Sequence, residues 1–260
     1  MKLFDSHCHL DDASFEKDWP QVLERMSANN VNAVMIAGIN LERSAKALEI
    51  SENHTGFYTA VGVHPHDASG CSETIVNTLA GLAENPKVRA WGEIGLDFNR
   101  MYSPQSDQEK WLMRQIEAAD HLNLPIIFHE RDSRGRLLEL LRAHPNPDRR
   151  GVIHCFSGTD TELAGYLEMG FFIGITGIVT IQKRGRQLRE QVGMIPVDRI
   201  LIETDAPYLT PAPQKNRHRR NEPAFVKSVL LKLADISGVD PETLSDTIWN
   251  NTRSLFGIHQ

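Results

Sequence analysis

The sequence predicts a closed barrel of eight parallel strands with a jacket of helices, the (β/α)8 or TIM-barrel class of α/β fold. Eight short, continuously apolar runs alternate with segments of helical periodicity, as expected for strands that are buried on both faces. The 260 residues match the usual length of one such barrel. An open doubly wound sheet, the competing fold, would need a glycine-rich phosphate turn, and the turns after the first three expected strands contain no G-x-G-x-x-G. We therefore expect residues 1–260 to form a single domain.

The first half of the chain supplies four of the expected strands. A strand-like run at residues 5–9 precedes a segment, 11–29, in which apolar residues recur near the helical period and Pro20 opens the main helix. The next three strands are short apolar runs that end at a glycine, a histidine or a glutamate. They lie at residues 33–37, 58–63 and 88–93, and the helices that follow them lie at residues 41–51, 73–84 and 108–122.

The second half repeats the same alternation. The expected strands lie at residues 125–129, 151–154, 171–175 and 199–203. Helices are expected at residues 133–143, 161–169, 223–237 and 241–256, with a partly helical, basic connection at residues 180–192. Residues 206–220 are too rich in proline to be helical, so we expect an ordered active-site loop, and Asn221 is expected to cap the helix that begins at Glu222-Pro223.

Composition limits the kinds of partner. The net charge is −6, so no global positive field exists to clamp a long polyanion, and any nucleic-acid contact must be local. Three cysteines are an odd, low number that fits a reducing compartment, and Cys8 and Cys155 are expected to face the core. The chain has no signal-peptide pattern and no apolar run near the ~18 residues of a membrane span. We therefore expect a cytoplasmic protein with no membrane contact.

A His-x-His pair near the start of the chain is the first candidate for metal binding. His7 and His9 lie two positions apart on an expected strand, so both side chains project from one face, although such a pair could also be two surface histidines. Four later apolar runs end at or near further metal-ligating side chains, namely Glu93, His129, His154 and Asp205. Because active sites of such barrels gather at the carboxyl ends of the strands, we expect all six side chains to meet at one mouth.

Six such ligands exceed what one tetrahedral ion uses when a water position stays open, so two divalent cations are predicted. Glu93 is expected to bridge them, with His7 and His9 on one ion and His129 and His154 on the other. Imidazole ligands favour zinc, manganese or iron. This arrangement is suited to hydrolysis of a phosphate ester without a covalent intermediate.

Asp205 is expected to ligate one cation and to act with Glu93 as a catalytic residue. A carboxylate in this place can accept a proton from the attacking water, whose pKa the cation lowers from about 15.7 towards 7. Each residue also has a simpler interpretation. His154 alone could be a hydrogen-bonded core histidine, and Asp205 alone could be a helix cap.

Short blocks of sequence along the whole chain carry a resemblance. They are DSHCHLD at residues 5–11, GVHP at 62–65, GEIGLD at 92–97, His129 with Arg131-Asp132, HCFSG at 154–158, ETDAPYL at 203–209, RNEP at 220–223 and NTRSLF at 251–256. Together these blocks resemble the TatD family of metal-dependent deoxyribonucleases. Some relatives lack the first histidine pair, which this chain retains, and Glu130 departs from the small or polar residue that often stands there.

The resemblance implies a metal-dependent hydrolase barrel of the amidohydrolase superfamily and a 3′ to 5′ exonuclease activity. The implied substrates are DNA 3′ ends, mainly single-stranded, with RNA as an alternative, and DNA repair is the implied setting. Two divalent ions of magnesium, manganese or zinc are implied, with ligand roles for His7, His9, Glu93, His129, His154 and Asp205. No obligate protein partner is indicated.

Substrate contacts are expected at five side chains: His64, Arg131, Tyr208, Arg217 and Arg220. Arg131 follows a ligand by two positions, so strand geometry would aim its guanidinium into the mouth, where it could hold a phosphate. It could instead pair with Glu203 or Asp97. The basic run at 215–220 is a candidate phosphate cluster or a solvated surface. Tyr208, like Phe156, could stack on a base or pack in the core.

Two other classes of function remain open. One is an amidohydrolase acting on a small cyclic amide or ester, or a deacylase of an aminoacyl nucleotide, because the same barrel and metals serve those reactions. Glu93 and the basic loop favour phosphodiesters. The other is a non-catalytic protein with structural metals, although structural zinc sites are usually closed and rich in cysteine. His144, His218 and His259 are expected to be ordinary surface residues.

Overall fold

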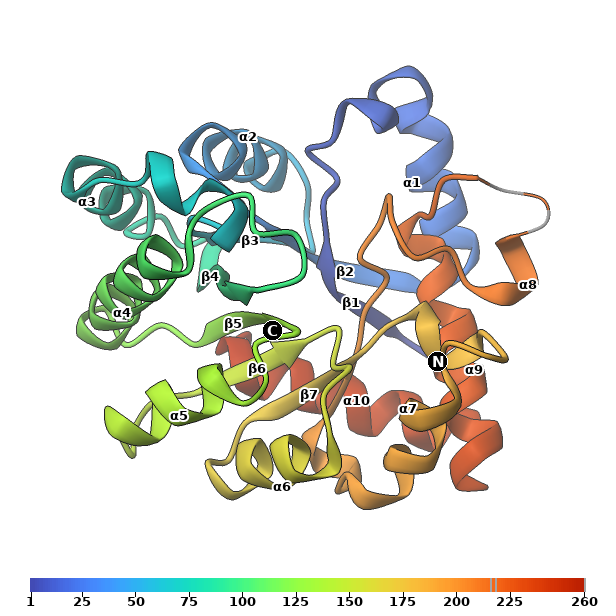
Figure 1. Ribbon diagram of the computed structural model, residues 1–260. Coiled ribbons are helices and arrows are strands. Elements are labelled where there is room, and N and C mark those ends of the chain that lie inside the picture. Colours follow the sequence, from blue (N-terminus) through green and yellow to red (C-terminus); the bar gives the residue numbers. More distant parts are fainter. Residues whose placement is uncertain (216, 218, 260) are drawn as a thin grey trace.

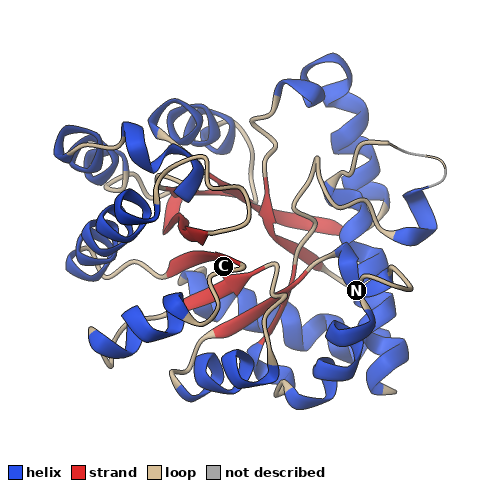
Figure 2. Ribbon diagram, in the orientation of Figure 1, coloured by secondary structure: helices blue, strands red, loops and turns tan. Residues whose placement is uncertain are grey.

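Eight parallel strands form a central barrel that helices surround, as Figures 1 and 2 show for the computed structural model. The structure describes residues 1–215, 217 and 219–259. The strands are β1 (Leu3–Cys8), β2 (Val31–Ala37), β3 (Phe57–Val61), β4 (Val88–Asp97), β5 (Ile126–Arg131), β6 (Gly151–His154), β7 (Phe172–Ile175) and β8 (Ile200–Ile202). Each strand pairs with the next in chain order, so the predicted (β/α)8 class is confirmed.

The barrel closes between its first and last strands through residues just beyond β8. The backbone N–H of Asp205 donates to the carbonyl of His7 at 2.9 Å, and that of His9 donates to the carbonyl of Ala206 at 2.7 Å. Ser6 Oγ donates to the carbonyl of Ile202 at 3.0 Å. The closure therefore brings His7, His9 and Asp205, which are almost 200 positions apart, to one rim.

Helices follow the strands and cover the outside of the barrel (Figure 1). They are α1 (Trp19–Ala28), α2 (Leu41–Glu52), α3 (Glu73–Leu82), α4 (Gln105–His121), α5 (Arg136–Ala143), α6 (Asp160–Glu168), α7 (Arg186–Gln191), α8 (Ala212–Lys215), α9 (Val226–Ser237) and α10 (Pro241–Phe256). Local chemistry sets several starts. Thr159 and Glu162 form a capping box at α6, and Asp240 caps α10 ahead of Pro241.

Two apolar layers make up the core. The larger layer lies between the strands and the helices. The smaller layer joins side chains of seven strands to the end of α10: Phe4, Ala33, Met35, Ala60, Ala90, Ile127, Val152, Leu201, Leu255, Phe256 and Ile258. Since these side chains from different strands contact one another, they fill the barrel interior, and α10 lies behind it (Figure 1). The opposite mouth is left to polar side chains.

Two strands run further than the sequence predicted. We expected β4 to end at Glu93 and β5 at His129, but pairing continues to Asp97 and Arg131. Gly95 explains the difference, because a glycine inside an apolar run predicts the end of a strand. In the structure Gly95 has φ +155°, and a Cβ there would overlap with the carbonyl of His129, so the glycine allows the two strands to approach each other. The extension carries the paired strands past the ligands and places Asp97 at the mouth.

The loop after β8 also differs in two details. We expected no helix in residues 206–220, but Ala212–Lys215 forms one turn, in which Pro213 is tolerated because the first helical turn needs no N–H partner. Asn221 Oδ1 accepts the backbone N–H of Glu222 at 2.9 Å, as expected of a cap, but the helix itself begins one residue later, at Pro223. The amide of Asn221 also donates to the carbonyls of Thr204 (2.8 Å) and Tyr208 (2.6 Å), which ties the loop to the end of β8.

None of the helices in the described ranges is both long and apolar enough to cross a membrane.

Candidate metal centre

Glu93 lies at the centre of a cluster of histidines at the mouth of the barrel. Its Oε2 is 3.3 Å from His7 Nε2, and its Oε1 is 2.5 Å from His129 Nδ1. Glu93 Oε1 also lies 3.7 Å from His64 Nε2 and 3.9 Å from His154 Nε2. The side chain is only 4 % exposed. The two carboxylate oxygens therefore face different sets of imidazoles, which is the arrangement expected of a carboxylate that bridges two cations.

Asp205 faces the same cluster from the end of β8. Its Oδ1 lies 3.4 Å from His9 Nε2, 3.7 Å from His154 Nε2 and 3.8 Å from His7 Nε2. At 16 %, its side chain is more exposed than those of Glu93 and His154. Asp205 therefore lies where a water molecule or a substrate could reach it.

Among the described residues, three groups of side chains bring their ligand atoms within 4.8 Å of one another: His7 with His154 and Asp205, His7 with His9 and Glu93, and His64 with Glu93 and His129. This grouping differs from the expected pairing of His129 with His154. The His154 ring stacks on His7 with centroids 3.5 Å apart, whereas the His129 and His154 centroids are 6.5 Å apart. Glu203 holds the other ring nitrogen of His154, at 2.6 Å.

His64 joins the cluster, although sequence reasoning placed it among the substrate contacts. It is 8 % exposed, and its Nε2 lies 3.2 Å from His129 Nδ1. The signal was present in the sequence, because His64 follows the third strand as His129 and His154 end theirs. What the sequence lacked was a reason to prefer a ligand role over a substrate contact.

The donors in the cluster fit divalent cations. The imidazole nitrogens of His7 and His9 lie 3.3 Å apart and those of His64 and His129 lie 3.2 Å apart, so each pair is close enough together to ligate one cation. The buried atom His7 Nδ1 has no hydrogen-bond partner among the described residues. Histidine and carboxylate donors around an accessible mouth match catalytic rather than structural metal sites.

Electrostatics favour neutral imidazoles beside an ionised carboxylate in part of the cluster. Burial, together with the neighbouring His154, lowers the pKa of His7, and burial with His129 holds the pKa of His64 well below its usual value. Burial opposes ionisation of Glu93, but the surrounding histidines hold the pKa of that carboxyl well below its usual range. These protonation states are the ones in which the side chains can donate lone pairs to a cation.

A second layer of carboxylates orients the ligands. Glu203 Oε2 lies 2.6 Å from His154 Nδ1 and accepts the backbone N–H of Cys155 at 2.9 Å. Room for Glu203 comes from Gly174, where a Cβ would overlap with the carboxylate. On the other side, Asp97 Oδ2 lies 2.7 Å from His66 Nε2 and 3.5 Å from His129 Nε2. Such partners fix the orientation of metal-binding histidines.

Arg131 is half-buried at the mouth, with no ion pair or hydrogen bond of its guanidinium in the described part of the chain. The partners that sequence reasoning offered are engaged elsewhere, Glu203 with His154 and Asp97 with His66. Tyr208 is 56 % exposed, and its ring lies edge-on to His9 with centroids 6.1 Å apart. Phe156, in contrast, is buried in the core. Arg131 and Tyr208 are therefore accessible at the rim.

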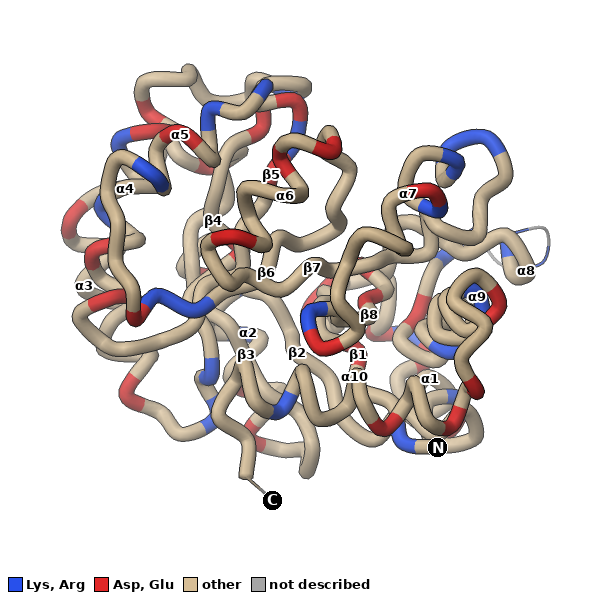
Figure 3. Tube along the Cα trace, turned by 90° about the horizontal axis from the view of Figure 1, so that it is seen from below, with Lys and Arg blue, Asp and Glu red and all other residues tan. Residues whose placement is uncertain are grey.

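The basic loop divides into an exposed and an engaged part. Arg217 is exposed in a turn, and the predicted surface residue His218 lies outside the described residues. Arg220 donates two hydrogen bonds to Asp18, both at 2.7 Å, donates to the carbonyl of Ser14, and lies over the Phe15 ring at 4.6 Å. Figure 3 shows basic segments beside α7 and α8 and mixed charge over the rest of that view.

Comparisons with known proteins agree with the fold and with the family resemblance of the sequence. A family model described as TatD related DNase matches residues 4–257. The "3'-5' ssDNA/RNA exonuclease TatD" of Rahnella sp. (strain Y9602) is 39% identical over 259 residues, which are 98% of this chain and 98% of that protein. The protein of the same name from Klebsiella pneumoniae (strain 342) is 39% identical over 258 residues, again 98% of each chain.

Solved structures of TatD homologues also superpose on almost the whole chain. The TatD homolog YJJV from Escherichia coli k12 superposes with a TM-score of 0.89 at 28% identity, covering 99% of this chain and 98% of that one. A hydrolase TatD family protein from Entamoeba histolytica gives a TM-score of 0.87 at 27% identity and 98% coverage of both chains. A probable 2-pyrone-4,6-dicarboxylic acid hydrolase from Acinetobacter baumannii, covering 99% of this chain and 100% of its own, shares only the fold, with a TM-score of 0.63 at 12% identity.

Proposed function

The chain belongs to the family of TatD-related DNases, and from that premise we propose that it is a metal-dependent exonuclease that removes nucleotides from the 3′ ends of single-stranded DNA or RNA. The observation that carries the proposal is the accessible cluster in which Glu93 faces histidines on both of its oxygens. The amidohydrolase alternative is supported only by the shared fold, since the probable 2-pyrone-4,6-dicarboxylic acid hydrolase is only 12% identical to this chain.

Two divalent cations, of magnesium, manganese or zinc, are proposed. His7, His9, His154 and Asp205 would hold one, His64 and His129 the other, and Glu93 would bridge them. When bound, such cations lower the pKa of water and neutralise the oxygens of a phosphodiester. Glu203 and Asp97 keep His154 and His129 in their orientations through the contacts at their second ring nitrogens.

The side chains at the rim then bind and orient the strand. Asp205, the more exposed carboxylate, would accept a proton from the attacking water. Arg131 presents a free guanidinium to a phosphate, because no carboxylate competes for it among the described residues. Tyr208 offers an exposed ring to a terminal base.

The basic loop plays a secondary part in the proposal. Arg217 is exposed and can contact the backbone of the strand. Arg220 stays a predicted substrate contact, but its hydrogen bonds to Asp18 favour a role in positioning the loop that carries Arg217. Since all three cysteines are free and fit a reducing compartment, we propose the cytoplasm as the place of action.

The proposal is tested with a single-stranded oligonucleotide labelled at its 5′ end and incubated with the chelated protein and added manganese. A ladder of products shortened from the 3′ end is expected with metal, and none with Glu93→Ala or with chelator. A duplex and a simple cyclic amide are run beside it. Cleavage of the amide alone, or full nuclease activity of Glu93→Ala, would reject the proposed activity.

A further inference from the structure

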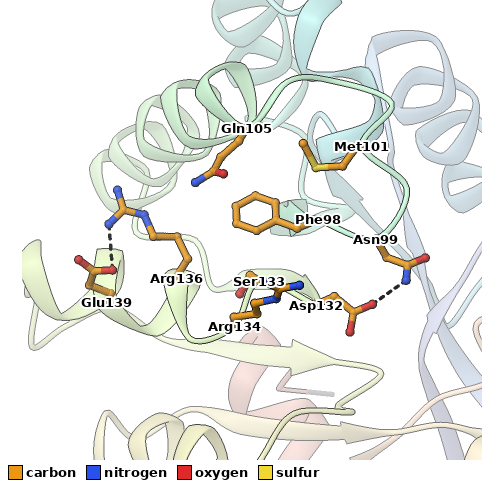
Figure 4. A pocket seen from close by; sticks show the side chains of 9 residues that line it. All are labelled: Phe98, Asn99, Met101, Gln105, Asp132, Ser133, Arg134, Arg136 and Glu139. Atoms are coloured by element: carbon orange, nitrogen blue, oxygen red, sulfur yellow. Dashed lines mark hydrogen bonds and ion pairs between the residues drawn. The ribbon is translucent and has the colours of Figure 1, made fainter.

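A cavity of about 860 Å³ opens between the loops that follow β4 and β5 (Figure 4). Phe98, Asn99, Met101 and Gln105 line one side, and Ser133 and Arg134 line the other. None of the side chains assigned to the metal centre lines it. The cavity is therefore a separate feature of the mouth.

The cavity begins one residue beyond Asp97, which contacts a histidine of the metal centre. Phe98 follows Asp97, whose Oδ2 lies 3.5 Å from His129 Nε2. The backbone N–H of Phe98 donates to the carbonyl of Arg131 at 3.0 Å, so the floor of the cavity continues the pair of strands that carries Glu93 and His129. A strand of nucleic acid with its phosphate at the cluster would have its neighbouring nucleotide within reach of this cavity.

The lining combines an apolar platform with polar groups. The half-buried ring of Phe98 points into the cavity, and Met101, 46 % exposed, lies above it (Figure 4). The Asn99 amide donates to Asp132 at 2.6 Å, which leaves its carbonyl oxygen as an acceptor. Gln105 donates to Glu109 at 2.7 Å in the same way. Aromatic rings beside amides are the usual means of holding an unstacked nucleobase.

Arg134 supplies the positive charge. It is exposed, and its guanidinium has no ion pair or hydrogen bond within the described ranges, whereas the neighbouring Arg136 is paired with Glu109 and Glu139. A free guanidinium at the rim of a base-sized cavity suits the phosphate that is attached to that base.

The loop that carries Phe98 is held in place before any ligand arrives. Asp97 Oδ1 accepts the backbone N–H groups of Asn99 (2.9 Å) and Arg100 (2.8 Å). The buried amide of Gln108 accepts from the N–H of Asp97 and donates to the carbonyls of Asp97 and Ser103. A platform fixed in this way loses little conformational entropy on binding.

We propose that this cavity is a binding subsite for one nucleobase of the single-stranded substrate, with Phe98 and Met101 against the base and Arg134 on its phosphate. The subsite lies across the barrel from Tyr208, because β4 and β5 are opposite β8 and β1 in the strand order. The reacting phosphate is thus held between two aromatic platforms. The inference rests on the proposed function, since it names the substrate of the same mouth.

The test is equilibrium binding of a 5′-fluorescein oligothymidylate to the full chain in chelator, by fluorescence anisotropy, with an abasic residue moved through the strand. Phe98→Ala is expected to weaken binding of the intact strand about tenfold. In the wild type, an abasic residue at one particular position should weaken binding by about the same factor as Phe98→Ala does. In Phe98→Ala, the same abasic strand should bind no more weakly than the intact strand. Wild-type binding that is insensitive to every abasic position, or a loss that persists in Phe98→Ala, would overturn the subsite.

Controls keep the test decisive. Met101→Ala changes an exposed side chain and replaces Phe98→Ala in the test if that variant does not fold. For Met101→Ala, we expect the difference in affinity between intact and abasic strands to be partly lost. Met194→Ala, at a similarly exposed methionine (49 %) that lines a different cavity, should bind like the wild type. Arg134→Ala should reduce the slope of the logarithm of the binding constant against the logarithm of the salt concentration by about one unit, whereas Arg142→Ala, on α5, should leave that slope unchanged.

Cleavage assays separate this inference from the proposed function. A wild type that degrades single strands from the 3′ end, with Phe98→Ala and Met101→Ala unchanged in binding and KM, would reject the subsite alone. A wild type that cleaves no nucleic acid would reject the proposed function, and the binding titrations would still decide whether the cavity holds a base.

Discussion

Glu203 Oε2 lies 2.6 Å from His154 Nδ1, so a fully buried carboxylate fixes the ring whose Nε2 faces Asp205. Burial opposes a charge on His154, but Glu203 and then Glu93 raise the pKa of the imidazole to about 10. The relationship makes Glu203 a positioning residue for the metal centre, because it acts through His154.

We expect Glu203→Gln to weaken manganese binding by about 10- to 100-fold, because the orienting charge behind His154 is lost while the size of the side chain is kept. Isothermal titration of the chelated protein measures the effect. Glu168→Gln, at an exposed glutamate paired with Arg142, is the matched control and should leave the affinity unchanged. An unaltered titration of Glu203→Gln would show that His154 needs no partner.

His64→Ala is expected to remove one of two cations, since His64 completes the group that contains Glu93 and His129. The measurement is the manganese content per chain after gel filtration, which should fall from about two to about one. His259→Ala, at an exposed histidine, should retain both. Retention of two ions by His64→Ala would return His64 to the substrate contacts.

Arg131→Ala should raise KM for a single strand about tenfold, with a smaller effect on kcat, because the free guanidinium is assigned to a phosphate. The salt dependence of kcat/KM should also flatten by about one unit of slope. Arg142→Ala provides the control for the loss of one positive charge. If KM stays the same at every ionic strength, Arg131 makes no phosphate contact.

Asp18 gives a prediction of stability against pH. Hydrogen bonds from Arg220, and then from Arg25, lower its pKa from 3.8 to about 2. Because the folded-state pKa is the lower one, the stabilisation is present above about pH 4 and is lost as the pH falls through about 2. Asp18→Asn should lower the free energy of unfolding at pH 7 by about 1 kcal/mol, since the side chain is 35 % exposed and partly screened.

Urea unfolding at pH 7 and at pH 2.5 measures that difference. The deficit of Asp18→Asn relative to the wild type should shrink at the lower pH. Asp148→Asn, at an exposed aspartate with no ion pair in the described part of the chain, should match the wild type at both. If the free energy of unfolding of Asp18→Asn falls short of the wild type by the same amount at both pH values, the contact between Asp18 and Arg220 does not stabilise the protein through charge.

Local patterns sufficed where one segment contains its own signals. The bounds of β6 at Gly151–His154 and of α10 at Pro241–Phe256 agree with prediction, because a short apolar run and a first-turn proline mark them. The continuation of β4 past Gly95 was missed, because that glycine serves a close approach to a neighbouring strand. No local pattern shows such an approach.

The site shows the same division. Strand ends indicated which side chains would meet, and the structure brings His7, His9, Glu93, His129, His154 and Asp205 together. Their grouping depends on Glu203 and Asp97, and the engagement of Arg220 depends on Asp18, some 200 residues away. These partners are far apart in the sequence and meet only through tertiary packing, which local sequence patterns do not reveal.

The most direct test of the central claim is anomalous diffraction from a crystal of the wild type soaked in manganese. We expect two peaks, one on each side of the Glu93 carboxylate, with His64 and His129 at one and His7 and Asp205 at the other. Absence of any peak in the mouth, or peaks that Glu93 does not contact, would contradict the assignment.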